Sequence, residues 1–195
     1  MQLSQTLGHA QIQAWTHLNL GRLALCQEQL AAARNSFAST QSLAGEHHMP
    51  LLAGHALAGL GQTALAQGDP AAAQRDLTAA LTIFAEVDAG AAALTRAHLS
   101  RVFLALEEPD ASLAYSTEAV TAVAAAQGSF IERQQAYLYH YQALTVCGQP
   151  QEAWRWLEKG RAMLLVQAAA LSDEWRESLL TAVPVNREIM ALSGA

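Results

Sequence analysis

Positive charge is scarce in this chain. Lysine and arginine together number 11 against 17 aspartates and glutamates, which leaves a net charge of −6, and Lys159 is the only lysine. The arginines do not cluster, whereas a protein that grips phosphate backbones needs a cationic patch. We therefore expect no nucleic acid as a partner.

Long apolar runs and cysteines are also few. No apolar run approaches the roughly 20 residues of a membrane-spanning helix, and no basic segment followed by an apolar stretch marks a signal peptide near the N-terminus. The two cysteines, Cys26 and Cys147, lie in apolar helical contexts, which predicts buried, unpaired thiols in a reducing compartment. We expect a cytoplasmic protein that does not interact with membranes.

Signatures of catalysis and of metal binding are missing from the sequence. There is no G-x-x-x-x-G-K-[ST] loop for phosphates, no H-E-x-x-H and no C-x-x-C, so the common nucleotide and zinc sites are excluded. The densest histidine cluster, His47 and His48 beside Glu46, is typical of a polar helix end. No nucleophile has a base close to it in the sequence. We predict neither an enzyme nor a cofactor or metal site.

Alanine and other helix formers dominate what is present. Apolar residues make up 52% of the 195 residues, enough for a sizeable core, and much of that fraction is alanine, the strongest helix former. Strand-like alternation of apolar and polar residues never extends beyond a few positions. The sequence therefore predicts an all-α protein.

Internal repetition indicates the architecture. The segment HLNLGRLALCQEQLAAARNSF (17–37) matches LAGLGQTALAQGDPAAAQRDL (57–77) at an offset of 40 residues, and weaker copies follow at 96–120 and 137–164. Each copy places a small residue on a first helix, a turn with Gly, Asp or Pro, and then a second helix with an alanine and a large apolar residue. Small residues let paired helices approach closely, and the large ones fill the seam. The residues concerned are Gly21, Gly61 and Ser100 on the first helices, Pro70, Pro109 and Pro150 at the turns, Ala33, Ala73 and Ala153 on the second helices, and Phe37, Leu77 and Leu157 in the seam.

This pattern of Leu-Gly, then Ala, then Phe or Leu resembles the tetratricopeptide repeat (TPR), in a variety with about 40 residues per repeat. The resemblance covers roughly residues 10–165 and implies a right-handed α–α superhelix of about four helix pairs. A HEAT-like or armadillo-like solenoid is the alternative, because its repeats are nearer this length; the Leu-Gly and Ala signature favours TPR. We expect helices at 9–27, 29–45, 50–67, 70–87, 89–107, 109–127, 129–147 and 150–171.

The two ends differ from the repeats. Residues 1–8 have the pattern of the tail of a second helix from an earlier repeat, so we expect an uncovered edge near Leu3, Leu7 and Ile12. Residues 9–171 form the four repeats, and residues 172–195 are predicted to be capping helices. There, Ser172 and Asp173 suit a helix start, Trp175, Leu179 and Leu180 are expected to cover the last repeat, and Pro184 ends that helix. Ile189 and Leu192 of a last short helix are expected to pack back.

The segment ESLLTAVPVNREIMAL in this tail is similar to one that closes the TPR region of bacterial signalling proteins. In those proteins the TPR region follows a nucleotide-binding switch domain of the STAND (signal-transduction ATPase) type. The resemblance implies that the chain belongs to a larger bacterial regulator, whose switch domain would respond to what the repeats bind. The residues of the tail themselves indicate only a cap.

In TPR proteins the first helices line a concave groove, and the resemblance carries that role to positions of this chain. The candidate groove residues are Trp15, Arg22, His55, Gln62, Arg101, Gln135 and Gln142, with the apolar positions Leu18, Leu25, Ala58, Leu65, Leu94, Ala97, Leu104 and Leu138 between them. Two arginines among amides suit a carboxylate or a peptide backbone.

Three functions are compatible with this surface. The leading hypothesis is a protein–protein interaction and sensor module that binds a peptide or protein in the groove. A second hypothesis is a self-assembling scaffold that forms a homodimer through the N-terminal edge. A third is a small-molecule sensor in which Trp15, His55 and Gln62 contact a sugar or another metabolite.

Overall fold

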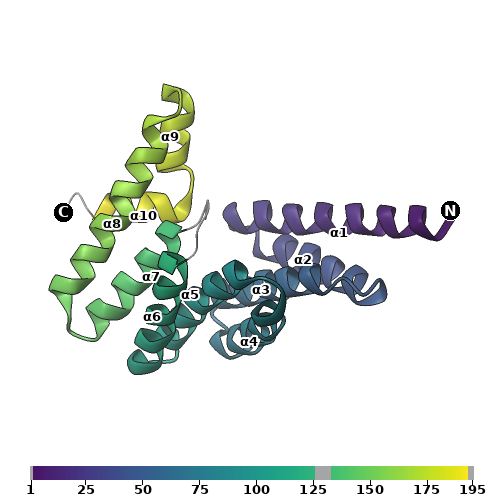
Figure 1. The fold of residues 1–195 in the computed structure, drawn as a ribbon, viewed down its shortest axis with the longest axis horizontal. Helices are drawn as coiled ribbons and strands as arrows, with labels where there is room; N and C mark the ends of the chain where they lie inside the picture. The colour runs from purple at the N-terminus through teal and green to yellow at the C-terminus, as the bar shows by residue number, and fades with distance from the viewer. Residues whose placement is uncertain (1, 126–132, 193–195) are drawn as a thin grey trace. The chain divides into compact units, whose positions relative to one another are not determined.

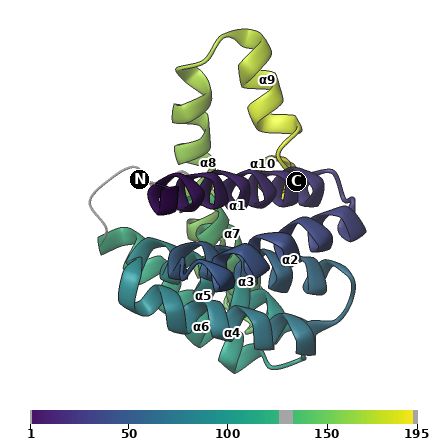
Figure 2. The ribbon, with the colours of Figure 1, turned by 90° about the vertical axis from the view of Figure 1, so that its right-hand side faces the viewer.

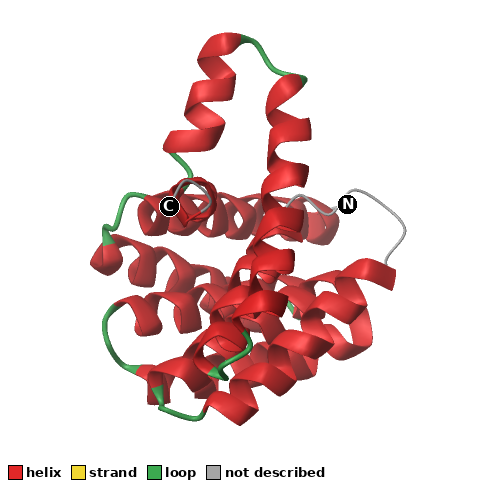
Figure 3. Cartoon of the chain, turned by 90° about the vertical axis from the view of Figure 1, so that its left-hand side faces the viewer, coloured by secondary structure: helices red, strands yellow, loops and turns green. Residues whose placement is uncertain are grey.

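The chain is built from helices alone throughout the residues that the structure describes. The computed structural model describes residues 2–125 and 133–192, with 88% of the chain helical and no strand among those residues (Figures 1 and 3). Consecutive helices pack as antiparallel pairs, as the sequence predicts. The helices are α1 (Gln2–Cys26), α2 (Leu30–Glu46), α3 (Pro50–Ala66), α4 (Pro70–Val87), α5 (Ala89–Ala105), α6 (Pro109–Ala125), α7 (Arg133–Val146), α8 (Pro150–Ala169), α9 (Asp173–Thr181) and α10 (Pro184–Leu192).

Pro70, Pro109 and Pro150 begin the second helices, which confirms their predicted positions. A proline at the first helical position loses nothing, because the N–H there has no partner within the helix. Just before each of these helices, one residue adopts a left-handed backbone. That residue is Gly68, with φ +79°, before α4, but Glu107, with φ +61°, before α6.

Because of this left-handed residue, the N–H of the residue after it can donate to a carbonyl near the end of the preceding helix. Asp69 donates to the Ala64 carbonyl oxygen at 2.9 Å, and Glu108 donates to that of Phe103 at 2.8 Å. These bonds satisfy carbonyls that the end of a helix would leave free. The same turn therefore recurs in several pairs, whether or not a glycine occupies it.

The chain forms two compact units, residues 1–95 and 96–195. In the first unit the ring of Phe37 on α2 fills the space left by two glycines. A Cβ built on Gly21 of α1 would lie 2.6 Å from this ring, and one on Gly59 of α3 would lie 2.5 Å from it. Phe37 is 1% exposed. The predicted pairing of a small residue on a first helix with a large one on the second is confirmed here, and Gly61 and Leu77 repeat it at 2.6 Å.

In the second unit, buried residues of α7 and α8 form the core. Ala153 and Leu157 of α8 are both fully buried, as predicted, and so are Leu138 and Ala143 of α7. Ser100 on α5 is buried too, and its hydroxyl donates to the Ala97 carbonyl at 2.8 Å. The small polar side chain therefore stands at the close-packed position without an unsatisfied hydroxyl.

The N-terminal end of the chain differs from expectation. Helix α1 runs without a break from Gln2 to Cys26, so the predicted start of a new helix at residue 9 is wrong. Gly8 has nothing within 4 Å of a built Cβ. This glycine therefore serves neither as a turn nor as a contact point, and the helix passes through it.

Two predictions fall outside what the structure describes. The side chains of residues 1–7 are among the parts left undescribed, so the expected edge at Leu3 and Leu7 stays a prediction, while Ile12 is exposed as expected. The predicted helix end at 127 and helix start at 129 lie within residues 126–132, which are also outside the described residues.

The C-terminal cap is confirmed at Ile189 but wrong at Trp175. Ile189 of α10 is fully buried, whereas Trp175 is 65% exposed and α9 has no buried residue. Leu179 and Leu180 are only half-buried. The cause is the rotation of α9, which turns Arg176 inward instead. The Arg176 guanidinium donates to the carbonyls of Ala168 and Leu171, both at 3.1 Å, at the end of α8.

Helix α9 is therefore an arm alongside the end of α8 (Figure 2). Ser172 is the N-cap residue of α9, but its side chain makes no capping hydrogen bond, and Asp173 pairs with Arg176 at 2.8 Å. Pro184 begins α10, as expected. Asn186 is buried and joins the two short helices by donating to the Leu179 carbonyl at 3.0 Å.

Candidate binding surfaces

Among the predicted groove residues of the first unit, Trp15 and Arg22 of α1 lie near His55 on α3. The rings of Trp15 on α1 and His55 lie 6.2 Å apart, and His55 also packs on Phe84 at 4.9 Å. Burial lowers the pKa of His55, the nearby positive charge of Arg22 lowers it further, and Asp88 acts in the opposite direction. His55 is therefore a neutral ring near pH 7 that packs between aromatic neighbours.

A cleft of about 220 Å³ lies beside Trp15, but the predicted sensor residues do not line it together. Its walls are Gln11, Trp15, Met49, Pro50, Leu51 and Leu52. Neither His55 nor Gln62 is among them, so the geometry does not assemble the triad expected for a small metabolite.

In the second unit, Arg101 of α5 and Gln135 of α7 meet at Tyr139. The Arg101 guanidinium lies over the tyrosine ring, 4.9 Å from its centroid, and one of its N–H groups donates to the hydroxyl at 3.4 Å. Gln135 Nε2 donates to the same oxygen at 2.8 Å. The tyrosine hydroxyl thus accepts twice and keeps its own proton, so this cluster presents hydrogen-bond donors and one positive charge.

Tyr139, the residue that joins Arg101 and Gln135, is not among the residues predicted from the sequence. A signal was present, because Tyr139 follows Gln135 by four residues and therefore shares its helix face. The tyrosine itself is buried, at 2% exposure, with its ring face and hydroxyl engaged by the cluster.

His98 packs under this cluster. Its ring meets Tyr139 edge to face at 5.5 Å. Burial, with a smaller contribution from the Arg101 charge, lowers the pKa of His98 to about 3. The histidine is therefore neutral at any pH near neutrality, and it adds no positive charge to the surface.

The last predicted groove residue, Gln142, forms a hydrogen bond with the C-terminal helix α10. Its side-chain amide donates to Glu188 of α10 at 2.7 Å. No pattern in the sequence indicates this contact, because the two residues are 46 positions apart.

Four apolar positions expected in the groove belong to the core instead. Leu18, Ala58, Ala97 and Leu138 are at most 9% exposed. The groove face inferred from the TPR resemblance included too many positions, because residues at the edge of a helix face already contact the neighbouring helices. The exposed members of the candidate surface are the arginines.

Neither arginine of the candidate surface belongs to an ion pair within the part of the chain that the structure describes. The ion pairs found among residues 2–125 and 133–192 involve Arg75, Arg96, Arg161 and Arg176. Arg22 and Arg101 are both exposed and lie outside these pairs. Their charges are thus available to a ligand.

The cysteines and histidines show no metal cluster in the described part of the chain, where no three His, Cys, Asp or Glu side chains converge. Cys26 is exposed at the last residue of α1, so the prediction that it is buried is wrong. Cys147 is half-buried, and its thiol donates to the Pro109 carbonyl at 3.5 Å. No helix within the described residues has the length and apolar character needed to cross a membrane.

Comparison with solved structures identifies the fold as TPR-like. A Podospora anserina protein described as a kinesin light chain, with nearly identical TPR-like repeats, aligns with a TM-score of 0.60. The alignment covers 92% of this chain and 87% of that one, at 16% sequence identity, and a second structure of that protein gives the same values. No family model and no curated protein matches the chain. At this identity the likeness establishes the fold alone.

Proposed function

We propose that this chain is a protein–protein interaction module that binds an acidic peptide or a peptide carboxylate on its first helices. The observation that carries the proposal is the cluster of Arg101, Gln135 and Tyr139. It combines an exposed guanidinium, which has no acidic partner among the described residues, with the side-chain amide of Gln135, and both groups donate to the buried Tyr139 hydroxyl. A carboxylate is the complementary acceptor, because a guanidinium can contact it through two parallel N–H groups.

The TPR-like fold supports this assignment, because repeats of this kind generally mediate protein–protein interactions. Charge supports it as well. The chain has a net charge of −6, so the positive charge of the exposed Arg101 attracts an acidic ligand that much of the remaining surface repels. Binding of this type needs no catalytic group, and we propose that the module has no enzymatic activity.

The experiment is a selection from a random peptide library, followed by affinity measurements on the selected peptides. We expect the wild type to enrich peptides with Asp, Glu or a free C-terminus. Arg101→Glu, alone and with Arg22→Glu, should weaken their binding about tenfold or more, because a charge-assisted contact becomes a repulsive one.

The matched control is Arg34→Glu, which changes charge equally at an exposed arginine of α2 outside the cluster. Unchanged affinity in Arg34→Glu and loss in Arg101→Glu would support the proposal. Equal affinity in wild type and in both groove variants would remove the arginines from the binding surface.

We also propose that the module works within a cytoplasmic bacterial signalling or transcriptional regulator. The support is the resemblance of the tail 177–192 to segments that close the TPR region of STAND-type proteins. The genomic reading frame upstream of Met1 tests this context. An in-frame nucleotide-binding domain would support it, and a stop codon directly upstream would contradict it.

A second candidate function, self-assembly, is favoured by one face of α1. Ile12, Leu20 and Leu23 project from the same side of the helix and are between 49% and 66% exposed. The proposed occupant is the same face of a second copy, because exposed apolar side chains favour association and a two-fold dimer brings the same face of both copies into contact.

Sedimentation or light scattering at high protein concentration tests this assembly. The wild type should form a dimer, and Ile12→Glu with Leu23→Glu should give a monomer. Val166→Glu, at another exposed apolar site on α8, should leave the dimer intact. A wild type that stays monomeric would rule the assembly out.

A further inference from the structure

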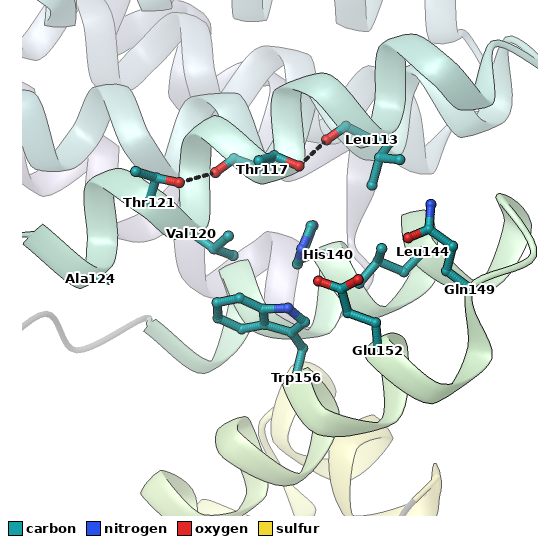
Figure 4. A pocket seen from close by; sticks show the side chains of 10 residues that line it. All are labelled: Leu113, Thr117, Val120, Thr121, Ala124, His140, Leu144, Gln149, Glu152 and Trp156. Atoms are coloured by element: carbon teal, nitrogen blue, oxygen red, sulfur yellow. Dashed lines mark hydrogen bonds between the residues drawn. The ribbon is translucent and has the colours of Figure 1, made fainter.

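A second concave site lies in the residue 96–195 unit, lined by residues other than those of the Arg101, Gln135 and Tyr139 cluster. It is a cleft of about 420 Å³ between α6 and α8, with α7 at its base (Figure 4). Its size suits a single amino-acid side chain or a small metabolite. The lining residues are Leu113, Thr117, Val120, Thr121, Ala124, His140, Leu144, Gln149, Glu152 and Trp156.

His140 Nδ1 lies 2.9 Å from the Ser116 hydroxyl oxygen. Because the Ser116 hydroxyl also donates to the Leu113 carbonyl at 3.1 Å, we assign the tautomer in which Nδ1 carries the proton and the serine oxygen accepts from it. Burial lowers the pKa of His140, against an opposing effect of Glu152, so the ring is neutral near pH 7 and Nε2 is an acceptor.

This Nε2 atom has no hydrogen-bond partner among the described residues, although the His140 side chain is only 4% exposed. Among the described residues, the polar atoms that are both fully buried and without a partner do not include Nε2, so this atom is accessible to solvent. The ring lines the cleft (Figure 4). A nearly buried side chain therefore directs an unused acceptor into an open site.

The threonines of the cleft are acceptors as well. The Thr117 hydroxyl donates to the Leu113 carbonyl at 2.7 Å, and the Thr121 hydroxyl donates to the Thr117 carbonyl at 2.7 Å (Figure 4). Because each hydroxyl already donates its single proton to a carbonyl of α6, its oxygen can only accept a hydrogen bond from a ligand.

Glu152 supplies negative charge to the site. It lies in the first turn of α8, and its carboxylate lies close to His140 in Figure 4. It belongs to none of the ion pairs found among residues 2–125 and 133–192. The charge is therefore available to a ligand in the cleft.

Trp156 adds an aromatic wall that can interact with a cation. Its ring meets His140 edge to face at 5.1 Å, and the Lys159 ammonium lies 4.6 Å from the Trp156 ring centroid. Lys159 does not line the cleft. The indole thus already holds one cation on its surface, which is the interaction expected of this ring.

We infer that this cleft binds an organic cation that donates hydrogen bonds, namely a primary ammonium or guanidinium group on an apolar stem. The charged group would donate to Glu152 and to Nε2 of His140, and the stem would lie against Val120, Leu144 and Trp156. Gln149 and the indole N–H are the other polar groups of the site, and a cationic ligand leaves both free to bond with water. This chemistry is opposite to that of the Arg101 cluster, so the two sites take different ligands.

Such a cation has two sources: the Lys or Arg side chain of a protein partner, or a free metabolite amine. Calorimetric titration with agmatine and with the blocked peptide acetyl-Ala-Arg-Ala-amide distinguishes them. Binding of the peptide alone assigns the site to a partner's side chain, and binding of agmatine assigns it to a free amine. We expect at least one of the two to bind, and N-butylacetamide, a neutral analogue, not to bind.

The decisive variant is Glu152→Gln, which keeps the shape of the side chain and removes its charge. Affinity should fall about tenfold or more. The matched control is Asp110→Asn, which removes an acid from the first turn of α6 outside the cleft and should leave affinity unchanged.

A direct readout is the nitrogen NMR spectrum of His140 in the wild type, where the unprotonated Nε2 signal should shift on addition of the bound probe. The inference is overturned if neither probe binds at millimolar concentration, if Glu152→Gln binds as well as wild type, or if N-butylacetamide binds equally. A bound probe that leaves the Nε2 signal unmoved would also overturn it.

Discussion

Acid should destabilise this protein, and His98 should account for a defined part of the loss. Its ordinary pKa of 6.5 falls to about 3 in the folded state because the ring is buried and Arg101 is close. Between these two values the unfolded chain binds a proton that the folded chain does not. Stability is therefore complete above pH 6.5, declines as the pH falls through that value, and stops declining below about pH 3.

The size of the effect follows from the two pKa values. About pH 5 is roughly 1.5 units below the ordinary pKa of histidine, so His98 is protonated in the unfolded chain but not in the folded one. This protonation stabilises the unfolded state and lowers the free energy of unfolding by about 2 kcal/mol. At about pH 7.5 the loss is close to zero. The folded ring remains neutral throughout, so it contributes nothing that offsets the loss.

The perturbation is His98→Phe, which keeps an aromatic edge against Tyr139 and cannot titrate. Urea denaturation followed by circular dichroism should be measured for both proteins at several values between about pH 5 and about pH 7.5. Burial also lowers the pKa values of His55 and His140, so both proteins will lose stability in acid. The wild type should lose about 2 kcal/mol more than the variant.

Parallel curves of stability against pH for the two proteins would contradict a lowered pKa of His98 in the folded state. They would mean that His98 takes up its proton in the folded state as readily as in the unfolded chain. Any constant offset between the curves reports the packing of phenylalanine and does not bear on the test, because only the difference in pH dependence depends on the pKa.

Three further predictions concern stability, each read from urea denaturation at neutral pH. Glu107→Gly should stabilise the protein by about 1 kcal/mol, because glycine adopts φ +61° without the cost that a side chain incurs; destabilisation would contradict this. Gly59→Ala should destabilise by about 1–3 kcal/mol, since its Cβ would lie 2.5 Å from the ring of Phe37, and a neutral result would show that the ring can move. Ile189→Ala should cost about 2–5 kcal/mol while Trp175→Ala costs within about 0.5 kcal/mol; the reverse order would restore Trp175 as the cap.

The repeats were predictable because each depends on local spacing. Gly21 and Phe37, or Gly61 and Leu77, have the same separation within each copy, and close packing of paired helices requires that separation. Prolines at helix starts and the turns before them placed most boundaries to within a few residues. Such signals lie within about 20 residues of one another, where a sequence pattern is easiest to recognise.

The errors lie where contacts join distant segments or where helix rotation is undetermined. The face of a nine-residue helix is poorly fixed by its own pattern, so Arg176 rather than Trp175 turned toward α8. Gln142 meets Glu188 across 46 positions, and His140 meets Ser116 across 24. No periodicity encodes such pairs, and His140, which the second pair holds in place, lines the cleft between α6 and α8.

The most direct test of the proposed interaction surface is an amide NMR titration of the wild type with an acidic peptide selected by it. We expect the largest shifts on α5 and α7 around Arg101, Gln135 and Tyr139, with a coupled change in the Arg101 side-chain signal. Shifts confined to α6 and α8, or spread evenly over the chain, would contradict this expectation.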